Sequence, residues 1–189
     1  MLYLRDRAEK RMNILFLDID GVLNSIPYFK SIKGILTREK NEIDETKMQL
    51  LKQIVDENNC SIVLSSSWRT SRNSSEPAEV ECWNYLVEMF RKYELEIMDI
   101  TPVIDNIRPL EIQTWLETQK REEPVCWISI EDDWDDEVYS EYGMEGHLIE
   151  TKLFGETPDS AGLLSEHIEM ARELFRKQIC INKSHRVTR

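Results

Sequence analysis

Two aspartates one residue apart, Asp18 and Asp20, come at the end of an apolar run and are followed at once by Gly21. The run has the length and composition of a buried strand, and on a strand this spacing directs both carboxylates to the same side. The glycine allows the backbone to turn sharply out of the sheet. Because carboxylates at the carboxyl end of a buried strand suit a hard cation, the sequence predicts a cation site with chemistry beside it.

A second apolar run, residues 62–64, leads into a serine-rich segment, residues 65–69. Serine at such a junction commonly caps a helix. A helix N-terminus also binds phosphate well, because its N–H groups and its dipole both favour an anion. The two interpretations are compatible, so the segment is a candidate phosphate site at the start of a helix.

A third apolar run, residues 125–130, opens into an acidic segment at residues 131–136. Such a segment is usually a solvent-exposed loop. Here it would face the carboxylates of Asp18 and Asp20, and charged groups rarely crowd a strand end in this way without a cation. The acidic segment is therefore predicted to complete the cation site.

These segments need strands and helices to position them. We expect buried strands at residues 14–18, 62–65, 95–100, 125–131 and 147–151. Helical spacing of apolar residues falls between them at residues 48–55 behind a cap at Asp44, at 80–90 behind Ser75 and Pro77, at 112–116 behind Pro109, and at 164–175 behind Asp159 and Ser160. This alternation predicts an α/β fold, a three-layer, doubly wound and mostly parallel sheet with helices on both faces.

Two segments fit neither periodicity. Residues 25–41 are expected to form an irregular flap over the site, and residues 70–76 a polar loop. Neither residues 25–41 nor residues 70–106 are long enough for a folded cap domain in addition to the helices already expected there. We therefore expect one domain at residues 12–178, an N-terminal arm at residues 1–11 and a basic C-terminal tail at residues 179–189.

The 189-residue chain has a formal charge of −12, which argues against broad electrostatic binding to nucleic acid or to anionic membranes. It does not exclude recognition of one phosphate through a metal ion. No apolar run approaches the length of a membrane span, the N-terminus lacks the apolar core of a signal peptide, and the four cysteines lack paired spacing. These features predict a cytoplasmic protein with no membrane partner, and they leave its oligomeric state open.

Taken in order over about residues 13–152, the motifs resemble those of the haloacid dehalogenase-like (HAD) phosphohydrolases. The D-G-V-L-N and S-S-S-W-R segments are similar to the branch described as the HAD domain of "Swiss Army Knife" RNA-repair proteins. The resemblance implies that Asp18 is the nucleophile and Asp20 the general acid/base. It also implies a Mg²⁺ ion held by Asp18, by the backbone carbonyl of Asp20 and by Asp132, with Asp136 as a later acid of the motif. Mg²⁺ is favoured over a softer metal because every ligand is an oxygen.

For the substrate phosphate, the resemblance implies contacts from Ser65 at the tip of the second strand, from Ser66 and from Arg108. The arginine is a departure, since most family members carry lysine there; arginine offers a planar two-point grip in place of a point charge. Glu131 is a second departure, because Gly or Asp is usual before the metal-binding aspartate. The sequence leaves open whether Glu131 or Asp133 also contacts the metal.

These implications converge on a Mg²⁺-dependent phosphatase that hydrolyses a phosphomonoester through an aspartyl-phosphate intermediate. Capless family members tend to act on bulky phosphoesters, so the expected partner is a phosphorylated substrate such as an oligonucleotide end. Trp68 and Arg69 are the candidates for contact with it beyond the phosphate, although ordinary packing and a surface salt bridge are the favoured roles for these two residues. A catalytically weak phosphate- or partner-binding module of the same fold, or a phosphatase of small metabolites or nucleotides, also fits the sequence.

Overall fold

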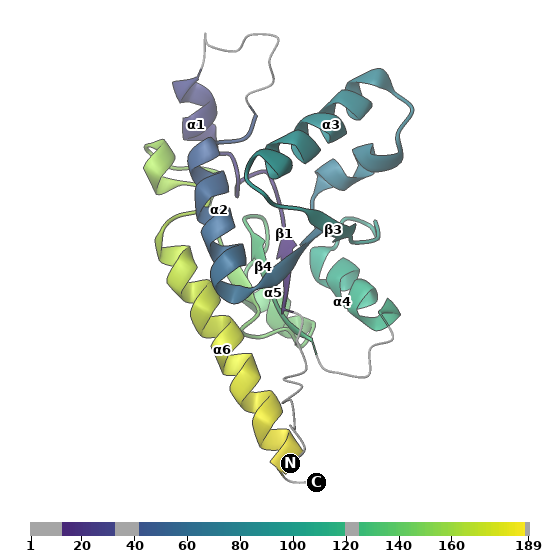
Figure 1. The fold of residues 1–189 in the computed structure, drawn as a ribbon, viewed down its shortest axis with the longest axis vertical. Coiled ribbons are helices and arrows are strands. Elements are labelled where there is room, and N and C mark those ends of the chain that lie inside the picture. Colours follow the sequence, from purple (N-terminus) through teal and green to yellow (C-terminus); the bar gives the residue numbers. More distant parts are fainter. Residues whose placement is uncertain (1–12, 33–41, 120–124, 188–189) are drawn as a thin grey trace, which may run out of the picture.

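The computed structural model describes residues 13–32, 42–119 and 125–187. Its centre is a five-stranded, all-parallel sheet in the order β3-β2-β1-β4-β5 (Figure 1). The strands are β1 (Asn13–Leu17), β2 (Cys60–Leu64), β3 (Ile97–Ile100), β4 (Cys126–Glu131) and β5 (Leu148–Glu150). The predicted α/β architecture with a parallel sheet is confirmed.

Successive residues of the central strand β1 face opposite sides of the sheet and so enter two separate cores. Leu15 and Leu17 belong to one core, whereas Ile14 and Phe16 belong to the other. The first core is covered by α2 (Glu45–Asn58), α3 (Pro77–Lys92) and α6 (Glu166–Val187). The second is covered by α4 (Arg108–Thr118) and α5 (Asp136–Glu141). The result is the three-layer arrangement visible in Figure 1, where α2 and α6 lie side by side.

The helix signals in the sequence were accurate at two of the four expected starts. Asp44 caps α2, and its side chain accepts a hydrogen bond from the Thr46 amide. Pro109 lies in the first turn of α4. The cap of α3 is Glu76 and not Ser75, with Pro77 as the first helical residue. The last helix begins at Glu166, later than expected.

Three short helices differ from the expectations: two of them were not predicted, and the third begins at the serine-rich segment, where a helix start was expected, but is a 3₁₀ helix. Ile26–Ser31 forms α1 inside the segment expected to be irregular, with Ser25 as its cap. Ser67–Asn73 forms a 3₁₀ helix, η1, which overlaps the expected loop, and Asp136–Glu141 forms α5. A further 3₁₀ turn, η2, spans Pro158–Ser160. All of these helices are too short for the spacing of their apolar residues to show a helical period.

Two of the expected segments lie partly or wholly outside the described residues. They are the N-terminal arm at residues 1–11 and, from residue 33 on, the flap at residues 25–41. The basic tail expected at residues 179–189 continues α6 as far as Val187. Within the described residues, no helix is both long and apolar enough to cross a membrane.

The chain order places the topological switch point of the sheet at the carboxyl ends of β1 and β4. The connections after β1 and β2 place α2 and α3 on one face, whereas those after β3 and β4 place α4 and α5 on the other. In a doubly wound sheet the loops therefore diverge between β1 and β4, and ligands bind at this switch point. The aligned register brings Leu17 opposite both Leu64 and Ile130, so the residues that follow the three strands meet at one edge.

Candidate active site

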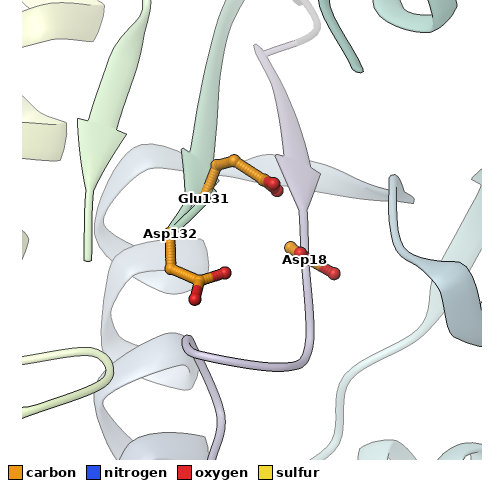
Figure 2. Close-up of side chains that lie close together, drawn as sticks. All are labelled: Asp18, Glu131 and Asp132. Carbon is orange, nitrogen blue, oxygen red and sulfur yellow. The ribbon is translucent and has the colours of Figure 1, made fainter. Parts of the chain in front are cut away.

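Three carboxylates meet at this edge. Asp18 follows β1, Glu131 ends β4 and Asp132 follows it, and each offers an oxygen within 4.8 Å of the others. Figure 2 shows the three side chains converging on one small space between the two strand ends. Asp18 and Glu131 are almost fully buried, whereas Asp132 is half-buried. The predicted grouping of Asp18 with Asp132 is present, and Glu131, which the sequence left open, is part of it.

The carboxylate of Asp18 is held from several directions. The Ile19 amide donates to its Oδ1 at 2.7 Å, and the Ser66 hydroxyl hydrogen-bonds to the same side chain. The Asp18 amide itself donates to the Ile130 carbonyl at 3.1 Å, which ties the residue to β4. Burial raises the pKa of Asp18, and the Ser66 hydrogen bond and the charge of Arg108 oppose that rise.

Gly21 is required for Asp132 to approach the cluster. Its φ is +68°, a left-handed conformation that glycine adopts without steric cost. A Cβ at this position would lie 2.0 Å from Oδ2 of Asp132. The hydroxyl of Thr151, just beyond β5, donates to the Gly21 carbonyl at 2.8 Å and lies 3.3 Å from the Glu131 carbonyl. The turn after β1 is thereby pinned against the end of β4.

Burial and mutual repulsion both disfavour charge on this cluster in the absence of a cation. Burial, followed by the charge of Asp18, raises the pKa of Glu131 to about 10. Burial, followed by the charges of Asp133 and Asp18, raises the pKa of Asp132 to about 7. Without a cation, burial and the neighbouring charge of Asp18 therefore favour the protonated form of Glu131. A bound cation would replace that proton and stabilise all three charges.

The donor set of the cluster fits a hard divalent cation such as Mg²⁺. All three ligand atoms are carboxylate oxygens, the type that Mg²⁺ prefers. Oε1 of Glu131 is buried and has no hydrogen-bond partner among the described residues. A buried carboxylate oxygen without a partner is costly, and coordination of a cation would remove that cost.

Asp20 lies in a hydrogen-bond arrangement of its own. The Asn24 amide group donates to its Oδ1 at 2.8 Å, and the Trp68 indole N–H donates to its Oδ2 at 2.9 Å. Asn24 is fixed in turn, because its own carbonyl oxygen accepts from the Gly21 amide at 3.0 Å. Asp20 is therefore oriented by two donors that the sequence did not single out for this purpose. Trp68 was a candidate for contact with substrate, whereas its N–H contacts the predicted acid/base residue.

The two serines expected to bind phosphate differ in their contacts. Both are buried. The Oγ of Ser65 accepts a hydrogen bond at 3.4 Å from the hydroxyl of Thr101, which follows β3. Ser66 contacts Asp18 and also caps η1, where its Oγ accepts from the Trp68 amide at 3.4 Å. Ser66 is thus the serine nearer to the predicted nucleophile, although Ser65 matched the family motif better.

Arg108 belongs to a buried network of ions. Its Nη1 lies 2.9 Å from Oε2 of Glu111, and Nη2 of Arg69 lies 2.7 Å from the same oxygen. Its Nε lies 3.9 Å from Glu131 and has no hydrogen-bond partner among the described residues. Burial would lower the pKa of Arg108, but the charges of Asp18, Glu131 and Glu111 raise it above its usual value. A permanent cation therefore lies beside the three carboxylates, and its buried Nε has no hydrogen-bond partner among the described residues.

Arg69 does not have the contact considered for it, and Asp136 lies apart from the carboxylate cluster. Arg69 is only 2% exposed, so it cannot contact substrate beyond the phosphate. It forms a salt bridge, as the alternative proposed, but a buried one with Glu111. Asp136 is exposed at the start of α5, where its amide donates to Glu150, and it is not part of the carboxylate cluster.

The parallel α/β fold is that of the HAD class. Residues 14–160, most of the chain, match the family model described as the HAD domain in Swiss Army Knife RNA repair proteins, and the chain belongs to this family. HAD domains are typically hydrolases and phosphatases. The searches of curated proteins and of solved structures found no match.

Proposed function

We propose that this protein is a Mg²⁺-dependent phosphatase that hydrolyses a phosphomonoester through an aspartyl-phosphate on Asp18. The observation that carries the proposal is the convergence of Asp18, Glu131 and Asp132 at the switch point of the sheet, with Arg108 beside them. Three carboxylates around one space and a buried cation at its edge suit a metal ion and a phosphate side by side.

Asp18, Glu131 and Asp132 are the side chains that would hold the metal ion, and the Asp20 backbone carbonyl is the further ligand that the family resemblance predicts. When bound, Mg²⁺ neutralises negative charge on the phosphoryl oxygens and on the attacking carboxylate. The near-complete burial of Asp18 excludes most water from around the nucleophile, which strengthens these electrostatic interactions.

The chain's own residues supply the two chemical steps. A carboxylate oxygen of Asp18 attacks phosphorus as the bond to the leaving oxygen breaks, and Asp20 gives its proton to that oxygen. Asp20 then accepts a proton from a water molecule, whose oxygen attacks phosphorus and releases phosphate from Asp18. The donors Asn24 and Trp68 hold the Asp20 carboxylate in one orientation for both transfers.

Arg108 and the serines after β2 are the groups we propose for binding the phosphate. The Nε of Arg108 is buried and has no hydrogen-bond partner among the described residues, which makes it the donor we assign to a phosphate oxygen, while its Nη1 is held by Glu111. Hydrogen bonds from a fixed guanidinium to a phosphate are charge-assisted and directional. Ser66 is positioned beside Asp18, and Ser65 lies next along the chain, so both remain candidates for phosphoryl contacts.

We propose that the substrate is a phosphate at the end of a nucleic acid or on another large molecule. Apart from α2 and α3, which pack on the sheet, the connections after β1 and β2 contain only the short helices α1 and η1 in their described parts, so these parts supply no folded cap that would enclose a small metabolite. The family description refers to RNA repair proteins, which is consistent with a nucleic-acid end. With a formal charge of −12, recognition has to be local to the site.

A phosphatase screen tests this proposal. Release of phosphate should be measured from 5′- and 3′-phosphorylated oligonucleotides, nucleotides and sugar phosphates, with Mg²⁺ and after chelation. Asp18→Asn should abolish turnover and leave the fold intact, because it removes charge and keeps volume. Asp132→Ala should raise the Mg²⁺ requirement more than Asp133→Ala, since Asp133 lies outside the carboxylate cluster. Full activity after chelation, or in the Asp18 variant, would refute the mechanism, and efficient turnover confined to sugar phosphates would refute the substrate class.

A further inference from the structure

A groove of about 260 Å³ adjoins the carboxylate cluster on the side of β5. Asp132 belongs to both the cluster and the groove, so the two are adjacent. The rest of the groove is lined by Asp133 and by the segment that follows β5, Thr151 to Phe154. Its volume lies just below the ~300–1,000 Å³ of sites that enclose a whole small molecule. It therefore suits one group of a larger substrate.

An exposed aromatic side chain stands in this groove. Phe154 is 70% exposed, the largest value among the large hydrophobic residues of the described chain. The other large hydrophobics of the segment around β5 are buried or half-buried, which makes Phe154 an exception. An exposed phenylalanine beside a reaction centre offers a flat apolar face to whatever enters the groove.

The backbone that carries Phe154 is firmly anchored. The Leu153 carbonyl accepts from the Ile26 amide at 2.9 Å, and the Lys152 carbonyl accepts from the Gly162 amide at 2.8 Å. Gly155 follows at once, and a Cβ there would lie 2.8 Å from the Ser160 carbonyl oxygen. These contacts hold the segment between α1 and the loop after η2, so the ring is presented from a fixed support.

The chemistry of the groove favours a flat heterocycle attached to a phosphate. An aromatic ring stacks on a nucleobase whatever the base, because every base has a π face. Lys152 lines the same groove and forms no ion pair within the described part of the chain. It is the positively charged residue of a lining that also includes Asp132 and Asp133, so it is the group in the groove that can attract a phosphate.

We infer that this groove is the leaving-group subsite, in which the ring of Phe154 stacks on the base of the nucleoside that carries the scissile phosphate. The inference rests on the proposed function, because it assigns the group attached to the phosphate that Asp18 attacks. It replaces Trp68 and Arg69 as the determinants of substrate beyond the phosphate, since the first contacts Asp20 and the second is buried.

The test compares two oligonucleotides that differ only in one base. One carries its terminal phosphate on an adenosine and the other on an abasic residue, and each is prepared with a 5′- and with a 3′-phosphate. For the wild-type protein, kcat/KM should be roughly tenfold higher with the adenosine, as stacking of one base predicts. Phe154→Ala should remove that preference by lowering kcat/KM for the adenosine substrate alone, and Phe154→Trp should keep it.

Met98→Ala is the matched control. Met98 is another exposed hydrophobic residue, but it lies on β3, at the opposite edge of the sheet from β5. It should leave the preference for adenosine unchanged. The inference is overturned if Phe154→Ala keeps the preference, or if it reduces kcat/KM equally for both substrates.

A binding measurement separates failure of this inference from failure of the proposed function. The same oligonucleotides should be titrated into Asp18→Asn and into the double variant with Phe154→Ala, by calorimetry. The single variant should bind the adenosine end roughly tenfold more tightly than the abasic end, and the double variant should bind both equally. If the wild-type protein shows no turnover but the variants give this binding pattern, the proposed phosphatase activity is refuted and the subsite is not. If Asp18→Asn binds both ends equally, the subsite is refuted.

Discussion

Replacement of Gly21 by alanine tests whether this glycine exists to let Asp132 reach the carboxylate cluster. The added Cβ would lie 2.0 Å from Oδ2, 2.1 Å from Cγ and 2.7 Å from Cβ of Asp132. An ordinary contact between heavy atoms is about 3.5 Å, so the Asp132 carboxylate must retreat by roughly 1.5 Å. Because the Cβ of Asp132 is also too close, rotation of the side chain alone does not relieve the clash.

The expected magnitude has two parts. The left-handed backbone at φ +68° costs an alanine about 1–2 kcal/mol, partly offset by the smaller entropy of the unfolded chain. A net loss of about 1 kcal/mol corresponds to a decrease in Tm of about 2–4 °C for a protein of this length. Displacement of Asp132 adds a loss of about 10–100-fold in Mg²⁺ affinity, the range seen when a group that orients a metal ligand is removed.

Gly143→Ala is the control for the first part alone. Gly143 has φ +70°, and a Cβ there would meet nothing within 4 Å. Both variants should therefore lose similar stability in the metal-free protein, measured by thermal unfolding in EDTA. Only Gly21→Ala should lose Mg²⁺ affinity, measured by calorimetric titration. Addition of Mg²⁺ should raise the Tm of this variant less than that of the wild type.

Two results would refute this reasoning. Wild-type Mg²⁺ affinity in Gly21→Ala would mean that Asp132 does not need its present position to bind the metal. An equal loss of affinity in Gly143→Ala would mean that the effect arises from general destabilisation and not from the clash with Asp132.

Three further predictions concern charges and donors around the site. The native pKa of Asp132, about 7, exceeds the unfolded value of 3.8, so the native state retains a proton that the unfolded state loses between about pH 4 and pH 7. Metal-free wild-type protein should therefore lose stability across this window relative to Asp132→Asn, and a constant difference in Tm from pH 4 to 8 would contradict the assignment. Trp68→Phe keeps the ring but removes the donor to Asp20, so kcat should fall about tenfold with little change in Tm; an unchanged kcat would show that this hydrogen bond has no catalytic role. Glu111→Gln leaves two buried arginines short of a negative partner and should cost about 3–5 kcal/mol in urea unfolding, against about 0–1 kcal/mol for Glu45→Ala in an exposed pair. Similar losses in the two variants would mean that the buried network is not a source of stability.

Much of the architecture could be predicted because it is recorded in local patterns. All five strands were expected from apolar runs, and the sheet formed by them is parallel, as alternation with helices implies. The carboxylates of Asp18 and Asp132 could be assigned to the same edge because each follows a strand, and parallel strands end on one side of a sheet. The short helices α1 and α5 were missed because six residues contain less than two turns of periodic signal.

The contacts inside the site could not be predicted in this way. The two-residue alternation of a strand predicts which face of the sheet a side chain lies on. It does not predict which residue of another element that side chain contacts. Trp68 donates to Asp20 across 48 residues of sequence, and this contact requires η1 to fold back over the turn after β1. Arg69 was expected at the surface for the same reason, because its partner Glu111 lies on a distant helix whose position only the packed structure supplies.

The amino-acid sequence by itself determined the class of fold, the position of the site and the residue types available for its chemistry, since these follow from periodicity and from polar residues at strand ends. Only the tertiary structure decided that Glu131 joins the cluster, that Ser66 contacts Asp18, and that Phe154 stands exposed beside Asp132. The physical reason is that these outcomes depend on the register between β1, β2 and β4 and on the loops anchored across them. The strand register and the loop positions are both fixed by interactions between segments far apart in the chain, and no local sequence pattern encodes these interactions.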